Sequence, residues 1–271
     1  MPDHPVHDLT QPDIAAAGHM LERAAWAARA FATYSSNDVD RIVRAVADAA
    51  HSAAHKYAEW AVRETGFGVV EHKVRKNEAC SRGIVETYAG HDYVSPRVRP
   101  DYKIIEVPRP AGVVLALTPS TNPIATLNFK ILLSLMTRNA IVISPHPMAK
   151  ECSADAADRL VQAAVAAGAP DGIIQCVAEP TIPLVEALMA DVRTKVIVAT
   201  GGTGVVRAAY SSGNPAIGVG PGNVPVLVDA TADLKLAASR IVESKAFDNS
   251  VLCTNESVLI VEESVAAPLV R

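Results

Sequence analysis

The chain has 271 residues, of which 49% are hydrophobic and only 4% are aromatic, and its formal net charge is −4. This length suits one large domain or two ordinary ones, and the hydrophobic share excludes a disordered chain. No run of Lys and Arg exceeds two residues, and no apolar stretch reaches the about 18 residues that a membrane span needs. We therefore expect neither a nucleic-acid partner nor a membrane partner.

The amino terminus, residues 1–10, is polar and contains Asp and His, a composition that a signal peptide does not have. The four cysteines, Cys80, Cys152, Cys176 and Cys253, form no CxxC pair. Scattered cysteines are typical of reduced thiols rather than of a disulfide framework or a zinc site. These features predict a cytoplasmic protein without a bound metal.

The part of the chain before residue 95 has the apolar spacing of helices. An Ala-rich run over residues 14–31 is followed by a second periodic run, which starts at Asn37 and Asp38 and ends at Gly66. A third run covers residues 69–88 and ends at Gly90. We expect residues 1–95 to be helices that pack on a cofactor-binding domain.

After residue 100 the pattern changes to short strands and helices. Residues 103–107 alternate like an exposed strand, and residues 112–117 form the continuous apolar run of a buried parallel strand. The later strands are predicted at residues 140–144, 173–177, 195–199 and 224–228, and the helices at residues 123–136, 150–167, 182–189 and 205–210. This alternation predicts an α/β fold, with a doubly wound parallel sheet in a dinucleotide-binding domain over residues 96–245.

Ligands of such sheets bind at the carboxyl ends of the strands, so the loops at residues 118–122, 144–147, 200–204 and 218–223 are candidates. Residues 200–204 (TGGTG) open a helix, and glycines there let the backbone approach a pyrophosphate. They lack the GxGxxG pattern, and a glycine-rich turn between a strand and a helix is more often only a tight turn, so that interpretation stays open. The glycines of residues 218–223 form either a compact linker or a ligand contact.

The two remaining loops also leave alternatives open. Residues 118–123 (TPSTNP) hold hydroxyls and an amide between prolines, which either cap the next helix or bind an oxyanion. His146, in SPHP, either faces solvent on a rigid loop or belongs to a site.

Cys253 lies between an apolar helix and a strand predicted at residues 257–261. Small and polar residues surround it, whereas we interpret the other three cysteines as packing residues. A thiol acts as a nucleophile only where its surroundings favour the thiolate and leave it accessible. Cys253 is therefore either a packing residue or a candidate nucleophile.

Five segments together resemble the aldehyde dehydrogenase superfamily. The resemblance is closest to its CoA-acylating branch, which includes the dehydrogenase half of bifunctional aldehyde–alcohol dehydrogenases. In family order, the segments are ETGFGVVEHKVRKN, PSTNP, KILLSLMTRNAIVISPHPMAK, ATGGTGVVRAAYSSGNPAIGVGPGNVPV and KAFDNSVLCTNES. They cover nearly the whole chain, and they imply a Rossmann-like sheet of the aldehyde dehydrogenase type.

The resemblance also implies roles for individual residues. Cys253 would be the nucleophile, and Asn122 would form the oxyanion hole with the backbone N–H of Cys253. The dinucleotide would lie along Leu117, Thr118, Pro119, Ser120, Thr121, Asn122, Ser144, His146, Gly202 and Gly220. We expect NAD as the cofactor. NADP is an alternative, since Ser144 carries no charge to repel a 2′-phosphate and His146 would tolerate one.

The implied reaction converts a small aldehyde, coenzyme A and NAD into acyl-CoA and NADH through a thioester on the cysteine. Hydrolytic relatives carry a Glu just before the glycine-rich segment, where it activates water, and the matching position here is Gly218. Without that carboxylate, a second thiol must accept the acyl group. The alternatives are a hydrolytic aldehyde dehydrogenase and an inactive truncated nucleotide-binding chain. Acetaldehyde is the default substrate; sulfoacetaldehyde, longer aldehydes and a semialdehyde are alternatives.

Family members continue beyond the nucleophile strand, by typical domain sizes for roughly 100–200 residues. We therefore expect residues 246–271 to be the start of a truncated catalytic domain. The missing part would supply a Glu for the nicotinamide ribose, most of the aldehyde pocket and a subunit-pairing strand. The full-length protein is expected to be a homo-oligomer, and the strand at residues 257–261 is expected to lack its sheet neighbours, leaving an exposed edge.

Overall fold

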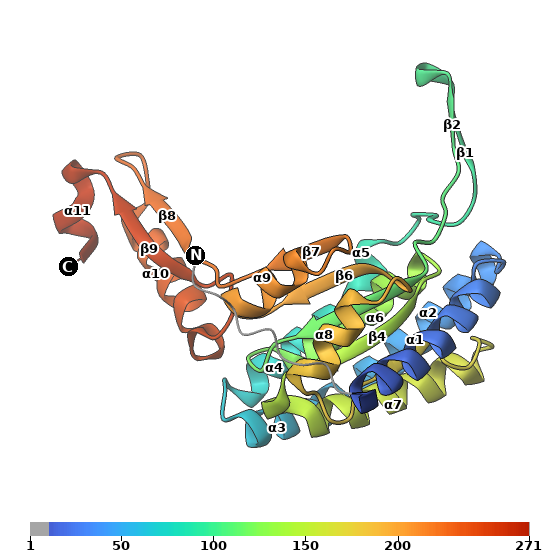
Figure 1. The fold of residues 1–271 in the computed structure, drawn as a ribbon. Coiled ribbons are helices and arrows are strands. Elements are labelled where there is room, and N and C mark those ends of the chain that lie inside the picture. Colours follow the sequence, from blue (N-terminus) through green and yellow to red (C-terminus); the bar gives the residue numbers. More distant parts are fainter. Residues whose placement is uncertain (1–10, 271) are drawn as a thin grey trace.

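The computed structural model describes residues 11–270, so the expectations about residues 1–10 and about the chain end at residue 271 lie outside the described residues. The described chain has three parts: an α/β body, a two-stranded arm that projects from it, and a C-terminal lobe (Figure 1). The body contains the large sheet and the amino-terminal helices. The two lesser parts each contain a two-stranded sheet.

The amino-terminal helices are α1 (Gln11–Phe31), α2 (Ser36–Ser52), α3 (Ala54–Thr65), α4 (Val70–Glu78) and α5 (Ile84–Thr87). The single helix predicted up to Gly66 is therefore wrong, because the chain bends at Ala53 (φ −104°, ψ 7°) and α3 begins after it. The apolar spacing continues on both sides of the bend, so periodicity does not reveal it. Gly66 ends α3 with φ 72°, in agreement with the expected helix end. The third run is interrupted by one π turn, Ala79–Gly83.

The large sheet has five parallel strands in the order β5-β4-β3-β6-β7. Every residue of β3 (Val113–Thr118) and β4 (Ala140–Pro145) is buried, because helices cover both faces of the sheet. The other strands are β5 (Ile174–Cys176), β6 (Thr194–Thr200) and β7 (Ala216–Val219). The chain moves from β3 outward to β5 and then returns to β6 beside β3, which confirms the doubly wound topology.

The crossover helices are α6 (Pro123–Met136), α7 (Lys150–Ala166), α8 (Ile182–Ala190) and α9 (Thr203–Ser211). Right-handed crossovers place α6 and α7 on one face, and α8 and α9 on the other. Helix α2 packs on α6 and α7, while α1 packs on α8 and on β4. Helix α2 thus forms a layer outside α6 and α7, whereas α1 lies beside α8 and directly against the sheet. Core side chains with no exposed surface include Leu115, Leu127, Ile131, Ile141 and Ile143.

Two differences concern the second half of the chain. Strand β7 contains Gly218, which the sequence placed in a loop; a four-residue edge strand with alternating burial gives no apolar run to detect. Strand β8 (Val224–Val228) leaves the large sheet and pairs in parallel with β9 (Glu256–Val261). The strand after the cysteine therefore has a neighbour, contrary to expectation, and the pairing joins both sides of the expected boundary at residue 245.

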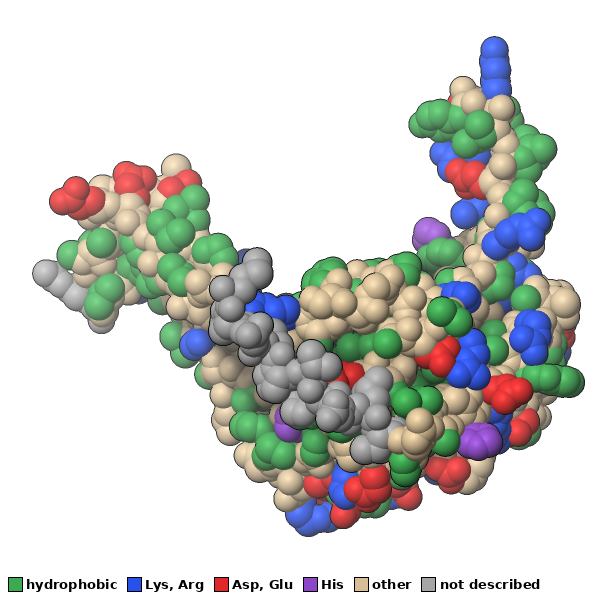
Figure 2. All heavy atoms as spheres, viewed as in Figure 1, with side chains coloured by type: hydrophobic (Ala, Val, Ile, Leu, Met, Phe, Trp, Pro, Cys, Tyr) green, Lys and Arg blue, Asp and Glu red, His purple; other side chains and the backbone are tan. Residues whose placement is uncertain are grey.

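The arm consists of β1 (Arg97–Arg99) and β2 (Ile104–Glu106), which pair antiparallel. It confirms the exposed strand predicted at residues 103–107. Its apolar side chains face outward, and Val98, Tyr102 and Ile105 are 68%, 67% and 66% exposed (Figure 2). The C-terminal lobe adds α10 (Leu234–Ala246) and α11 (Glu263–Val270) to β8 and β9. Within residues 11–270, no helix is long and apolar enough to cross a membrane, and no cluster of His, Cys, Asp and Glu suits a metal ion.

Lys130 on α6 places a buried amine between β3 and β6. Its Nζ donates hydrogen bonds of 2.7 Å to the carbonyls of Leu117 and Val198, which belong to these two strands. The residue is 4% exposed. Removal of the ammonium from water lowers the pKa of Lys130 from 10.5 to about 7.

This lowered pKa makes stability depend on pH. Below the folded pKa of about 7, Lys130 carries its proton in both states and the cost of burying a cation is present in full. As pH rises toward the unfolded value of 10.5, the folded state has lost the proton while the unfolded state still holds it, so stability increases. We predict that Lys130→Met flattens this rise by about 1–3 kcal/mol between about pH 7 and pH 10. Urea titrations at both pH values measure the free energy of unfolding. An equal increase from the lower to the higher pH in variant and wild type would contradict this prediction.

Candidate active site

The four candidate loops meet at one edge of the large sheet. Thr118, Pro145, Thr200 and Val219 are the last residues of β3, β4, β6 and β7. Thr118 pairs with Pro145, and Thr200 pairs with Val219, so these strand ends lie side by side. The reversal of strand order falls between β3 and β6, and this is where open α/β sheets bind their ligands.

Several residues expected to hold a dinucleotide leave a polar group unpaired or space open at this edge. Thr118 is 4% exposed, and its Oγ1 has no hydrogen-bond partner among the described residues. A Cβ added to Gly202 or Gly220 would meet nothing within 4 Å. Gly202 precedes α9, whose first turn has no side-chain cap, so its N–H groups are available to an anion. These features fit a dinucleotide phosphate.

The other expected cofactor residues differ in their surroundings. Leu117 and Ser144 are buried, each 4% exposed, at the ends of β3 and β4. Pro119, Ser120 and Thr121 are half-buried in the loop after β3. His146 is exposed, and its Nδ1 accepts a 3.2 Å hydrogen bond from the backbone N–H of Met148. The imidazole thus caps the amino-terminal end of the short helix after β4, residues Pro147–Ala149.

Cys253 is the exposed member of the four cysteines, all of which are free thiols. It lies in the turn before β9, where its side chain is exposed rather than packed among the described residues. Burial raises the pKa of the Cys152 and Cys80 thiols, and it raises that of Cys176 to about 12. Those three thiols are therefore held in the unreactive protonated form.

Gly222 brings the glycine-rich segment against Cys253. A Cβ added to Gly222 would overlap the carbonyl oxygen of Cys253 and lie 3.1 Å from its carbonyl carbon. The backbones of the two segments therefore touch, and only glycine permits this approach. This contact explains the glycine at position 222 and brings the glycine-rich segment beside Cys253.

Asn122 joins the loop after β3 to the cysteine segment. Its Nδ2 donates to the carbonyl of Val251, at 3.3 Å, and to Oγ1 of Thr121, at 3.2 Å. Its Oδ1 accepts a hydrogen bond from Nζ of Lys76 on α4. The side chain makes no cap on α6, so the capping interpretation is wrong for this residue.

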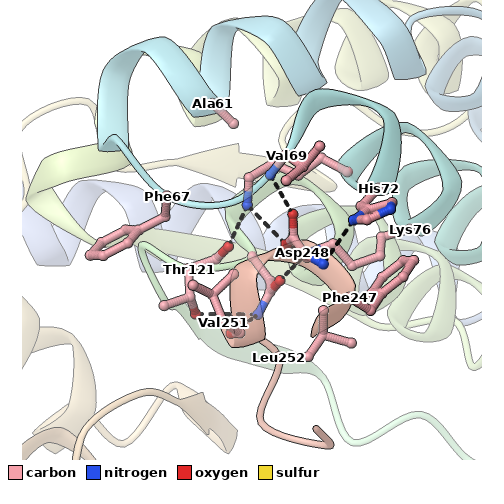
Figure 3. A network of polar contacts seen from close by, with 12 residues as sticks. Ala61, Phe67, Val69, His72, Lys76, Thr121, Phe247, Asp248, Val251 and Leu252 are labelled. Carbon is pink, nitrogen blue, oxygen red and sulfur yellow. Dashed lines mark hydrogen bonds and ion pairs between the residues drawn. The ribbon is translucent and has the colours of Figure 1, made fainter. Parts of the chain in front are cut away.

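Beside Asn122 lies a buried ionic network that the sequence-based prediction did not assign (Figure 3). At its centre is Asp248, whose carboxylate has no exposed surface and accepts from Nζ of Lys73 at 3.4 Å and from Nζ of Lys76. The same carboxylate accepts from the backbone N–H of Val69 at 2.8 Å. The backbone N–H of Asp248 donates to Nδ1 of His72, which stacks on Phe247.

A signal for this network was present in the sequence. Lys73 and Lys76 are three residues apart, so they share one face of α4. Two cations on one buried face need a carboxylate partner, since an uncompensated buried charge is costly. The sequence does not say which carboxylate, because Asp248 lies 172 residues beyond Lys76.

We predict that Gly222→Ala destabilises the protein, because the added methyl group would overlap a backbone atom that no side-chain rotation can move away. The expected loss is about 1–3 kcal/mol in the free energy of unfolding, as for other overpacked sites. The control is Gly18→Ala in α1, where the Cβ would make an ordinary 3.7 Å contact with Arg193. Urea titrations compare the two variants, and equal midpoints would refute the close approach.

Sequence comparisons now place these features in a family. The family model described as the aldehyde dehydrogenase family matches residues 3–271. The bifunctional aldehyde-alcohol dehydrogenase AdhE of Escherichia coli K12 is 44% identical over 254 residues, which are 93% of this chain and 28% of that protein. The acetylating acetaldehyde dehydrogenase EutE of Salmonella typhimurium is 42% identical over 233 residues, or 84% of this chain and 49% of that protein.

Solved structures agree with this placement. An acetylating aldehyde dehydrogenase from Geobacillus thermoglucosidasius has a TM-score of 0.91 and 41% identity, covering 98% of this chain and 59% of that one. Propionaldehyde dehydrogenase from Rhodopseudomonas palustris with bound propionyl-CoA has a TM-score of 0.84 and 33% identity, covering 94% of this chain and 56% of that one. The chain thus spans between 28% and 59% of the length of these relatives. By family match, fold and the arrangement of its strand ends, this chain belongs to the aldehyde dehydrogenase family.

Proposed function

We propose that the chain is the cofactor-binding and nucleophile-bearing part of an enzyme that converts a small aldehyde, CoA and NAD to acyl-CoA and NADH. Of the relatives named above, EutE and the Geobacillus enzyme are named as acetylating, and the Rhodopseudomonas enzyme carries bound propionyl-CoA. Another structure of the Rhodopseudomonas enzyme contains CoA and an acylated cysteine. The observation in this chain that carries the proposal is the environment of Gly218.

Gly218 leaves no space for a side chain. A Cβ added there would lie 2.6 Å from Cγ1 of Val206 and 2.8 Å from the ring of Tyr210, both on α9. The Tyr210 hydroxyl also accepts a 3.0 Å hydrogen bond from the backbone N–H of Gly218. The position at which hydrolytic relatives carry their general base is thus filled by neighbouring side chains. Without that base a thiol, which ionises far more readily than water, is the favoured acyl acceptor.

The reaction then follows from the groups at the strand ends. The thiolate of Cys253 attacks the aldehyde carbon, and the C=O bond becomes an alkoxide stabilised by Nδ2 of Asn122 and the backbone N–H of Cys253. One such donor contributes typically about 10²–10³ in rate. A bound nicotinamide supplies the hydride acceptor that turns this adduct into a thioester. The CoA thiolate next attacks the thioester carbon, and the bond to the Cys253 sulfur breaks, which restores the thiolate.

NAD is the cofactor that we propose. Glu64 accepts 2.8 Å hydrogen bonds from the backbone N–H groups of Glu151 and Cys152 at the start of α7, the helix that follows β4. A carboxylate thus occupies the anion-binding end of this helix and would repel a 2′-phosphate. NADP is the alternative, since an engineered glycolyl-CoA reductase with 31% identity has been solved with bound NADP⁺.

Four further expectations are part of this proposal. The aldehyde is small, and acetaldehyde is the default. The complete protein forms a homo-oligomer, which the exposed apolar side chains of the β1–β2 arm support. The protein is cytoplasmic, for which its four free thiols are the support. Residues 1–95, 96–245 and 246–271 are the helical, dinucleotide-binding and nucleophile-bearing parts.

We predict that the complete protein reduces NAD with acetaldehyde through repeated turnovers only when CoA is present, because no carboxylate at position 218 activates water to release the acyl group. The measurement is NADH absorbance with and without CoA, combined with quantification of acetyl-CoA and acetate. Sustained turnover without CoA, with acetate as the product, would favour the hydrolytic alternative. Absence of any dehydrogenase activity would favour the inactive nucleotide-binding chain.

Replacement of Cys253 by Ala is expected to abolish turnover while leaving NAD affinity unchanged, because the sulfur forms the covalent bond but does not hold the dinucleotide. The matched control is Cys176→Ala, a mostly buried thiol at the end of β5, which should retain activity. Steady-state kinetics and NAD titration by fluorescence measure the two quantities. Turnover that persists in Cys253→Ala would assign the chemistry to another group.

A further inference from the structure

We propose that Lys76 is a positioning residue, which holds the amide oxygen of Asn122 and thereby directs the amide N–H groups toward the cysteine segment. This inference rests on the proposed function, because an oriented Asn122 matters only if it stabilises an alkoxide. Nζ of Lys76 donates hydrogen bonds to Oδ1 of Asn122 and to Oδ2 of Asp248. The Lys76 side chain is 11% exposed, and that of Asp248 has no exposed surface.

The amide of Asn122 can adopt two orientations that differ by a half-turn. An Asn side chain presents an acceptor on one side and a donor on the other, and a half-turn exchanges them. In the wrong orientation, an oxygen would face the developing alkoxide and repel it. An ammonium group is a donor only, so Lys76 selects the orientation in which Oδ1 faces it. The Val251 carbonyl is an acceptor only, and it selects the same orientation from the opposite side, at 3.3 Å from Nδ2.

Lys76 also brings a positive charge to the amide oxygen of Asn122. A cation on the amide oxygen draws electron density from the amide and makes its N–H groups stronger donors. In a buried place this polarisation is weakly screened. It has its largest effect when the alkoxide forms, so it stabilises the transition state more than the bound aldehyde. A positioning role of this kind therefore affects kcat more than KM.

The carboxylate of Asp248 holds Lys76 in place. Burial lowers its pKa to about 8, while the hydrogen bond to Asp248 favours the charged form. Asp248 itself begins three consecutive left-handed residues, with φ of 53° at Asp248, 53° at Asn249 and 60° at Ser250. Residues with side chains rarely adopt this conformation, and the bonds to α4 hold it. Lys76 thus anchors Asn122, while Lys73 and the backbone N–H of Val69 also hold Asp248 and the segment that leads to Cys253.

A double-mutant cycle in the complete protein tests the inference. We expect Lys76→Met to lower kcat for CoA-dependent aldehyde oxidation about 10–100-fold, with KM for aldehyde and for NAD within about twofold. In an Asn122→Ala background the same substitution should change kcat by less than about twofold, because the residue that it positions is gone. The comparator is Lys73→Met, which also loses a bond to Asp248 but contacts the Thr121 carbonyl rather than the Asn122 side chain. Lys73→Met should change kcat by the same factor in the wild-type and in the Asn122→Ala background.

Each outcome discriminates. An equal kcat loss for Lys76→Met in both backgrounds would show a general structural role and overturn the inference, while leaving the proposed function intact. Absence of CoA-dependent turnover in the wild type would overturn the proposed function and this inference together. Melting temperatures show which variants fold. If Lys76→Met does not fold, Lys76→Gln keeps a donor but loses the charge, and its cycle with Asn122→Ala decides by the same criterion.

Discussion

The buried carboxylate of Asp248 is the contact on which the arrangement of the site depends. It binds two lysines and a backbone N–H of the α4 region, while its own backbone belongs to the segment that precedes Cys253. A carboxylate without exposed surface is tolerated only where such partners compensate its charge. Lys76 also binds Asn122. The ion pairs of Asp248 therefore connect the amino-terminal helices, the loop after β3 and the segment that precedes Cys253. Removing Asp248 would leave two buried lysines without their carboxylate, whereas after removal of one lysine the other still compensates Asp248.

The large sheet provides the second requirement, a place for a dinucleotide. Its strand order reverses between β3 and β6, and the glycines at positions 202 and 220 leave open space beside that reversal. The chain passes from β7 to the lobe of β8 and β9, and Gly222 lies at this transition, against the backbone of Cys253. Cys253, the proposed nucleophile, is therefore positioned by two segments, the glycine-rich one and the one anchored at Asp248. In contrast, the space next to Gly218 is filled by α9, which is consistent with acyl transfer to a thiol.

The sequence predicted the elements that depend on local pattern and missed those that depend on distant contacts. Helix α6 agrees residue for residue with its prediction, because a proline begins it and continuous apolar strands lie on both sides. Strand β7 was missed because a short edge strand with a glycine resembles a loop. The bend at Ala53 was missed because no Gly or Pro marks it. Of the site, the sequence supplied Cys253, Asn122 and the loops, whereas the role of Asp248 depends on contacts across 172 or more residues.

The central claim is that Cys253 carries the acyl group and that water does not remove it readily. Mass spectrometry of the complete protein, incubated with acetaldehyde and NAD in the absence of CoA, tests this claim most directly. The account predicts an acetyl group on the peptide that contains Cys253, stable until CoA is added and then released as acetyl-CoA. An unmodified Cys253 peptide, or an acetyl group that water removes as fast as CoA does, would contradict it.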